Sequence, residues 1–207
     1  MNLRLLPLLA LAFALPGEEL LVRDLRLSVG SAPADFDYEL RDDLASTSGS
    51  DAFDDTWQVG LRAAWSWSGP GRSWGPIVGA ELIYEQASFG AGAYDQVALR
   101  GLAGLGWQPG DDWTLSALAV LGAGRPSFEV PVATGGTIAT AGASAQTGLL
   151  LGLEWAPSRT WRLGIEVGWS EEAATLSGDD VELELQRSGL SAAIGVTWVW
   201  SRQPVRL

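Results

Sequence analysis

Apolar and polar residues alternate along most of the chain beyond residue 20, with the period of two that is typical of half-buried β-strands. In the segment 57–67, for example, Trp57, Val59 and Leu61 share one face, whereas Gln58 and Arg62 share the other. Eight segments show this pattern, at residues 25–29, 57–67, 78–85, 96–107, 113–124, 146–155, 161–169 and 190–200. The alternation is weakest in 113–124. Because no helical period separates these segments, the sequence predicts an all-β fold.

The connections between the segments alternate in length. Short connections rich in Gly, Pro, Ser and Asp occupy residues 68–73, 108–112 and 156–160. Long connections occupy 31–55, 86–95, 125–144 and 170–188. Short turns at one end and long loops at the other are typical of an up-and-down barrel. We therefore expect an eight-stranded antiparallel meander, in which residues 130–140 and 181–186 either extend strands or form loop hairpins.

The two faces of the predicted strands indicate a transmembrane barrel. One face carries large aliphatic side chains and Trp, and the other carries Gly, Ala, Ser, Gln and charged residues. A soluble barrel has its apolar face inside, whereas a membrane barrel turns that face toward lipid and keeps a polar interior. We predict a structural ion-pair network in the lumen, formed by Arg26, Arg62, Glu81, Glu85, Arg100, Glu154, Arg162 and Glu166. The alternative, in which two of these carboxylates act as a catalytic pair, stays open.

The Trp residues are concentrated near one rim of the predicted barrel. Of the 11 Trp, nine lie beside the short connections or near the end of the last segment. Trp is enriched where a barrel wall crosses the membrane–water interface. The predicted interfacial girdle consists of Trp65, Trp67, Trp74, Trp107, Trp113, Trp155, Trp161, Trp198 and Trp200. A second girdle at the other rim would use Trp57, Tyr84, Tyr94 and Trp169, and Trp packed inside a soluble barrel is the alternative.

The segment 152–169, with sequence GLEWAPSRTWRLGIEVGW, resembles the strand–turn–strand repeats of small OmpA/OmpX-type outer-membrane β-barrels. The final strand, which ends with Trp198 and Trp200, resembles the aromatic-ended signal read by the barrel assembly machinery, although residues 201–207 follow it. The resemblance implies a barrel over residues 20–201 with a short tail at 202–207. It also implies the outer membrane of a Gram-negative-type bacterium, with outer-membrane lipid and lipopolysaccharide as the surroundings.

Residues 1–14 read MNLRLLPLLALAFA, with an early Arg4, an apolar run and a small-x-small ending at Ala14. These are the three parts of a secretory signal peptide, which could extend to about residue 17. A buried N-terminal helix or strand is the alternative interpretation.

Charge is distributed unevenly along the chain. The chain has 25 acidic residues against 13 basic ones, all of them Arg, and a net charge of -12. The four long connections hold 16 of the acids and three Arg, so the acidity belongs to the predicted extracellular loops. Such a charge argues against nucleic acid as a partner. Acidic pairs such as Asp42-Asp43 could bind Ca²⁺ or Mg²⁺, whereas simple solvation of the loops is the alternative.

The chain has no His and no Cys. This excludes Ser–His–Asp and Cys–His nucleophile systems, and we predict no catalytic residues, no cofactor and no resident metal. The resemblance implies the same, because the enzymatic outer-membrane barrels use a His in their sites. We expect a monomeric structural or surface-interaction protein with a filled lumen. A narrow passive channel for water or very small solutes is the alternative, and a lipid-modifying enzyme comes third.

Overall fold

The computed structural model describes residues 19–41, 46–53, 55–68, 73–110, 112–131, 137–178 and 181–205. The predicted signal peptide lies outside these residues. Within them no helix is long and apolar enough to cross a membrane. The described residues form ten strands: β1 (Glu19–Ser31), β2 (Ala34–Arg41), β3 (Ser46–Ala52), β4 (Asp55–Ser68), β5 (Trp74–Phe89), β6 (Gly92–Trp107), β7 (Trp113–Pro131), β8 (Thr137–Trp155), β9 (Trp161–Gly178) and β10 (Val181–Val205).

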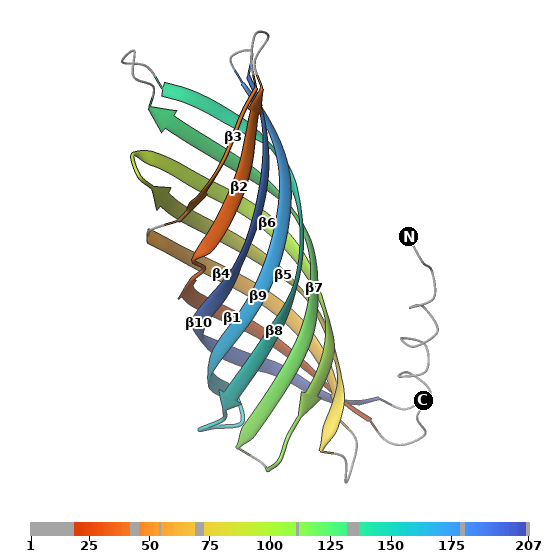
Figure 1. Cartoon of the computed structure of the whole chain (residues 1–207). Helices are drawn as coiled ribbons and strands as arrows, with labels where there is room; N and C mark the ends of the chain where they lie inside the picture. Colours follow the sequence, from red (N-terminus) through yellow and green to blue (C-terminus); the bar gives the residue numbers. More distant parts are fainter. Residues whose placement is uncertain are drawn as a thin grey trace.

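Eight of these strands close into a ring. The sheet order runs from β1 through β4 to β10, and β1 also pairs with β10, with antiparallel pairing throughout. The result is a tilted cylinder in which strands follow one another around the wall (Figure 1). This confirms the predicted all-β, up-and-down antiparallel barrel with eight strands around its circumference.

The remaining two strands correct the prediction of a long loop at 31–55. β2 continues β1 along β10 in the same register, since Ser31 pairs with Ala192 and Ala34 pairs with Gly189. β3 pairs with β2 and leads into β4, so β1–β2 and β3–β4 form one long, interrupted hairpin. Residues Ala32 and Pro33 interrupt the first half, where proline has no N–H for a ladder hydrogen bond.

The two halves of this hairpin differ in register by one residue. Asp35 follows Gly30 by five positions, whereas Gln58, the partner of Gly30, follows Ala52, the partner of Asp35, by six positions. The additional residue is a β-bulge, which reverses the faces of the strand beyond it.

Two other long connections also prove to be mainly strand. β7 runs to Pro131 and β8 begins at Thr137, while β10 starts at Val181 opposite Gly178 of β9. Residues 130–131, 137–140 and 181–186 therefore extend strands, and residues 132–136 lie outside the described part of the chain. The β5–β6 hairpin is shorter and turns at Gly90, whose φ of 49° favours glycine. At the other end of β10, residues to Val205 pair with β1, where a tail from residue 202 was expected.

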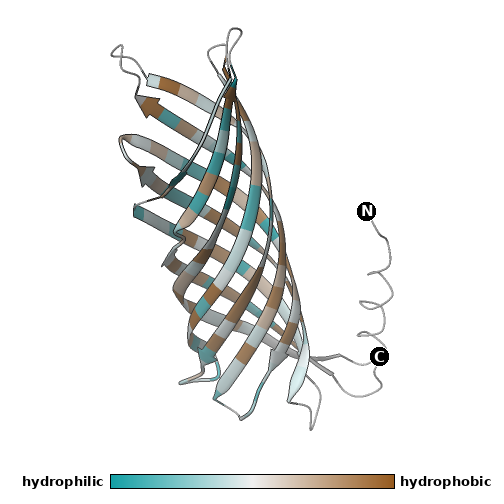
Figure 2. Cartoon of the chain, viewed as in Figure 1, coloured by the Kyte–Doolittle hydropathy of each residue, from teal (hydrophilic) through white to brown (hydrophobic). Residues whose placement is uncertain are grey.

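The barrel wall separates an apolar exterior from a largely polar interior. Leu27, Leu121 and Ile194 point outward and are 56%, 69% and 68% exposed. Figure 2 shows hydrophobic residues alternating with paler ones along the strands of the lower half. Leu118 and Val120, where the alternation was weakest, point inward and pack with Leu102 and Leu150. Strand geometry thus places charged and small residues in the lumen and large aliphatic residues on the outer surface.

Candidate functional site

Three residues of the predicted network, Arg26, Glu154 and Arg162, meet Asp24 and Thr197 near the end of the barrel with the short turns. Arg26 Nη1 lies 3.0 Å from Glu154 Oε1, and Arg162 Nη1 lies 3.3 Å from Glu154 Oε2. Thr197 Oγ1 donates a further hydrogen bond of 2.6 Å to Glu154. Arg162 Nη1 is also 4.0 Å from Asp24 Oδ2. Glu154 of β8 therefore accepts hydrogen bonds from β9, β10 and β1.

A second layer is centred on Arg62. Its Nη1 lies 2.6 Å from Glu166 Oε2, and its Nη2 lies 2.9 Å from Glu81 Oε1. Nη2 also donates to Glu166 Oε1 at 2.8 Å, which makes the Arg62–Glu166 contact bidentate. All three side chains are buried.

Arg100 has a different environment from the one that we predicted. Its Nε donates to Gln146 Oε1 at 2.8 Å, and no ion pair to a carboxylate joins it within the described residues. Gln146 in turn donates to Gln96 at 2.7 Å, and Gln96 donates to Ser144 and Glu172. The middle of the lumen thus holds a chain of amides, where uncharged Gln side chains take the place of a paired carboxylate.

An upper ion cluster contains two residues that the sequence analysis assigned to extracellular loops. Arg187 makes two hydrogen bonds to Glu85, of 2.6 and 2.7 Å, and its Nε lies 2.5 Å from Glu172 Oε2. The buried Tyr94 donates to Glu172 at 3.3 Å, and its ring centroid lies 4.9 Å from the Arg187 guanidinium. The prediction of Tyr94 in an outer girdle is therefore wrong. Tyr94 follows the inward parity of Gln96 on β6, and Glu172 and Arg187 likewise continue the inward faces of β9 and β10.

An aromatic cluster is buried inside the barrel above these charges. It is formed by four of the chain's five Phe residues, Phe36, Phe53, Phe89 and Phe128. Phe36 stacks on Phe53 at 4.7 Å, and Phe89 stacks on Phe128 at 4.5 Å between ring centroids. Edge contacts of 5.3 and 6.0 Å join the two pairs. Leu176, Leu183 and Leu185 are buried in the same core. We call these four rings the aromatic plug.

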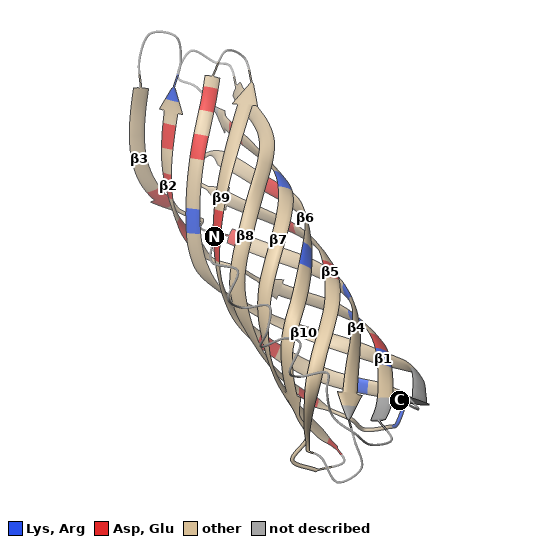
Figure 3. Ribbon diagram, turned by 90° about the vertical axis from the view of Figure 1, so that its right-hand side faces the viewer, with Lys and Arg blue, Asp and Glu red and all other residues tan. Residues whose placement is uncertain are grey.

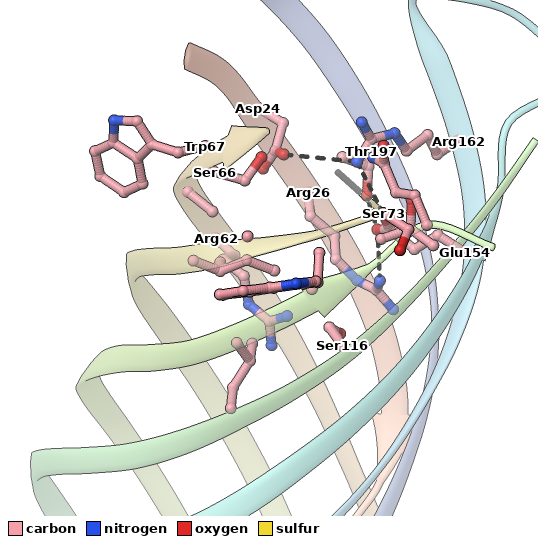
Figure 4. A pocket seen from close by; sticks show the side chains of 18 residues that line it. Asp24, Arg26, Arg62, Ser66, Trp67, Ser73, Ser116, Glu154, Arg162 and Thr197 are labelled. Carbon is pink, nitrogen blue, oxygen red and sulfur yellow. Dashed lines mark hydrogen bonds and ion pairs between the residues drawn. The ribbon is translucent and has the colours of Figure 1, made fainter. Parts of the chain in front are cut away.

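A cavity of about 60 Å³ remains at the lower end of the lumen. Arg26, Arg62 and Arg162 line it together with Asp24 and Glu154 (Figure 4). A second cavity, of about 20 Å³, lies beneath the upper ion cluster, beside Arg100 and Gln58. The apolar layer formed by Leu102, Leu118, Val120 and Leu150 contributes lining residues to both cavities.

The Trp residues lie mainly on the outer wall. Eight of the nine predicted girdle positions are exposed: Trp65, Trp74, Trp107, Trp113, Trp155, Trp161, Trp198 and Trp200. Register aligns three cross-strand pairs, Trp74 with Trp107, Trp113 with Trp155 and Trp161 with Trp198. Trp67 is half-buried and lines the lower cavity. Towards the other end of the barrel, the rings of Trp57 and Tyr84 are in contact, with their centroids 5.3 Å apart, and Trp169 is also exposed.

Acidic side chains collect on the outer surface of the upper wall. Figure 3 shows them on β2 and the strand beside it, where Asp35, Asp37 and Glu39 of β2 lie near Glu182 and Glu184 of β10. Glu39 and Glu184 are directly opposite each other and share Arg41, at 2.9 and 3.2 Å. The hydrogen bond from Arg41 lowers the pKa of Glu39.

No group of three acidic residues in the described part of the chain comes together as a metal site. The pairs Asp42-Asp43 and Asp179-Asp180 and one member of Asp54-Asp55 lie outside the described residues. Divalent cations thus remain a prediction.

The outer surface identifies the environment of the barrel. A belt of exposed Leu, Ile and Val lies between the Trp-rich rim and the Trp57–Tyr84–Trp169 level, and it encloses buried ion pairs. Water would strongly disfavour this arrangement, whereas a bilayer matches it. The outer surface is therefore that of a transmembrane β-barrel.

Comparisons with known proteins found no matching family model and no similar curated protein. Several solved structures are similar. One is the attachment invasion locus protein Ail of Yersinia pestis, in complex with the heparin analogue sucrose octasulfate. Its sequence is 16% identical, the TM-score is 0.35, and the match covers 83% of this chain and 98% of the Ail chain. The outer membrane protease OmpT of Escherichia coli has 8% identity and a TM-score of 0.48, with coverages of 86% and 97%. The outer membrane protein OprG of Pseudomonas aeruginosa has 10% identity and a TM-score of 0.44, with coverages of 89% and 96%.

Proposed function

We propose that the chain is a non-enzymatic outer-membrane barrel with a closed lumen, whose extracellular wall has a structural or surface-interaction role. The observation that carries this proposal is the aromatic plug on top of stacked ion-pair layers. If the lumen is closed, the protein can interact with other molecules only through its outer surfaces.

Two features support closure to solutes. At the outer end the two stacked Phe pairs form a buried apolar cluster above Arg187 and Tyr94. Further down, the cavities of about 60 and 20 Å³ are large enough for a few water molecules and for one, respectively. Between the two cavities lie Leu118 and Val120 on one side of the lumen, and the ion pairs of Arg62 on the other side. An ion would have to displace paired charges or apolar side chains to pass.

The upper wall supports the interaction role. β7, β8 and β9 have 18 or 19 residues and β10 has 25, against 14 and 16 in β4 and β5. The longer strands rise beyond the apolar belt and, with β2 and β3, form a rigid extension. Its inner side is anchored by Phe36, Leu183 and Leu185. Its acidic outer side favours cationic partners.

Planar-bilayer recording of the refolded protein tests the closed lumen. We expect no discrete conductance steps above the bare bilayer at moderate voltage. Stable steps would overturn the proposal and favour the narrow channel. Heat-modifiable migration in detergent gels verifies in the same sample that the barrel is folded, so that an absence of steps reports on the lumen and not on failed insertion.

A non-enzymatic role is supported by residue chemistry. The chain has no His or Cys, and the lumen carboxylates Glu81, Glu85 and Glu166 each contact an arginine. The oxygens of a carboxylate held in this way are engaged by the guanidinium and are poorly placed to contact a substrate. Incubation with radiolabelled phospholipid and lipopolysaccharide provides the test, and turnover that Glu81→Gln abolishes would contradict the proposal.

A further inference from the structure

Strand β3 has a paired neighbour on one side only. It stands last in the sheet order and pairs with β2, but with no other strand in the part of the chain that the structure describes. Figure 3 shows it at the margin of the upper wall, beside β2. Alternate residues of such a strand direct their backbone N–H and C=O groups away from the sheet, where a further strand can pair with them. In the orientation of the proposed function, on which this inference rests, this edge is extracellular.

Two hydrogen bonds identify the residues whose backbone faces this open side. Phe53 donates its backbone N–H to the Ala34 carbonyl at 3.0 Å, so the odd-numbered residues of β3 bond to β2. The N–H of Ala52 instead donates to the side chain of Asp51, with N–Oδ1 at 2.8 Å, and is thereby capped. The same parity directs the backbone groups of three serines to the open side: Ser46, Ser48 and Ser50. We call these three residues the β3 edge.

The β3 edge lacks the devices that usually prevent strand addition. Exposed edges are commonly protected by Lys, by Pro or by a bulge. β3 reads STSGSDA, with no Lys and no Pro, and it pairs with β2 without a change of register. Its side chains are small, so they leave the backbone groups accessible to an added strand.

Charge on the neighbouring strand narrows the choice of partner. Ser48 lies directly opposite Glu39 of β2. Ser50 lies opposite Asp37 in the same way, so all four side chains share the outer face. Across the outer faces of β2 and the upper part of β10, the described residues include five carboxylates and a single arginine, Arg41. An added strand therefore meets a negative surface.

The small serines allow a partner to reach these carboxylates. Adjacent strands are about 4.8 Å apart, which places β2 about 10 Å from a strand added at the β3 edge. A Lys or Arg side chain of that strand can lie across a serine and bring its charged head to a carboxylate that projects from β2. Because alternate side chains of a strand share one face, basic residues at every second position suit this surface.

We propose that the β3 edge is a strand-addition site for an extended, basic segment of another protein. The backbone of that segment exchanges hydrogen bonds with the β3 edge, and its basic side chains bind Asp37 and Glu39. A neutral strand lacks the second set of contacts. A second copy of this chain also lacks it, and pairing of two β3 edges would bring like charges together.

Amide hydrogen exchange of the full chain, folded in a sugar-headgroup detergent, tests the mode of binding. The probe is a capped peptide in which Thr and Lys alternate. With peptide at ten times its dissociation constant, exchange of the Ser48 and Ser50 amides should slow roughly ten-fold. The Thr47 and Gly49 amides, which already bond to β2, should change little. Protection that is absent, or uniform along β3, would overturn the proposal. Protection of the serine amides that rises with protein concentration before peptide is added would assign the edge to a second copy, and would also overturn it.

Backbone pairing is tested separately from charge. Ser48→Pro removes one N–H from the β3 edge and keeps the bonds to β2, so it should weaken binding roughly five- to ten-fold. Ser48→Ala keeps that N–H and should bind like the parent protein. A fully N-methylated form of the peptide, which keeps its charge, should give no alternating protection of the unaltered protein, whether or not Ser48→Pro folds. Equal binding of the two Ser48 variants, or of the two peptides, would contradict strand addition.

The charge contribution is tested on the outer face. Asp37→Asn should weaken binding several-fold at low salt, and the difference should shrink as salt is added. Glu171→Gln removes an exposed carboxylate from β9, two strands beyond β2, and should have little effect. Equal effects of the two variants would show attraction to the whole acidic wall and would contradict the proposed contacts. A protein that fails to bind the peptide can still lack conductance, so this proposal and the closed lumen fail independently.

Discussion

Arg187 of β10 and Glu85 of β5 face each other across the lumen and form a bidentate ion pair, with Nη1–Oε1 at 2.6 Å and Nη2–Oε2 at 2.7 Å. The two residues are 102 positions apart in the sequence, and both are buried. The pair therefore ties together strands that are not neighbours in the wall, directly below the aromatic plug.

Removing one partner of this pair should destabilise the barrel strongly. Glu85→Gln leaves Arg187 with one carboxylate in place of two, and we expect the free energy of unfolding to fall by about 3–5 kcal/mol. Equilibrium unfolding from lipid vesicles measures this change. Glu39→Gln makes the same chemical change in the exposed pair with Arg41 and should reduce stability far less, because water screens that pair. Equal losses in the two variants would contradict the structural role of the lumen pair.

A glycine makes room for one of the lumen arginines. A Cβ added at Gly195 would lie 2.7 Å from Arg26 Nε and 2.9 Å from the Leu27 carbonyl oxygen. Gly195→Ala should displace Arg26 from Glu154 and reduce stability by about 1–3 kcal/mol. Gly101→Ala is the matched control, because the nearest atom to its Cβ would be 3.7 Å away, on the outer wall. Comparable unfolding curves for the two variants would show that the close contact is not required.

The aromatic plug should hold the β2–β3 hairpin against the barrel. Phe36→Ala removes the ring that contacts Phe53, Phe89 and Phe128, at a cost of about 3–5 kcal/mol. We expect faster trypsin cleavage after Arg41, which ends β2, while the membrane-embedded part stays protected. Val29→Ala, a truncation on the lipid face of β1, should leave the cleavage rate unchanged. A cleavage rate in Phe36→Ala equal to that of the parent protein would show that backbone pairing with β10 alone secures the hairpin.

The exposed Trp residues should report the membrane interface. Because eight of them line one rim of the outer wall, their fluorescence should be quenched more by lipids brominated near the headgroup than by lipids brominated near the chain end. Trp161→Phe with Trp198→Phe, which removes a stacked pair at 6.3 Å, should lower the headgroup quenching. Stronger quenching by lipids brominated near the chain end would place the Trp side chains in the bilayer interior and would contradict an interfacial girdle.

Much of the fold follows from the period of two, because each strand has one lipid face and one lumen face. The same parity could have been continued beyond the predicted segments. Extending β10 backwards from Ala193 puts Arg187 and Leu183 inside, and extending β6 puts Tyr94 inside. These residues lie beyond the ends of the predicted segments, within the predicted loops, and were therefore expected at the surface.

Two features of the lumen could not be predicted from the alternation of inward and outward residues along the strands. The bulge between β3 and β4 shifts the faces by one residue, so Phe53 points inward although the alternation of β4 would place it outward. The inward orientation of Arg100 likewise does not predict its hydrogen-bond partner. Its neighbours across the lumen depend on how strands are staggered around the ring, and there an amide, Gln146, occupies the place beside it.

From Asp24 to Arg41 a single stretch of chain lies along β10 without any change of register, interrupted only at Ala32 and Pro33. These are the first and last segments of the cylinder, which meet only when it closes. A slip of one position along this seam would turn Arg26 toward lipid, at about 2–4 kcal/mol near the bilayer centre, and would turn Leu27 into the lumen. The bilayer therefore disfavours pairing of this stretch with β10 in the wrong register, and so favours closure of the barrel in the correct register.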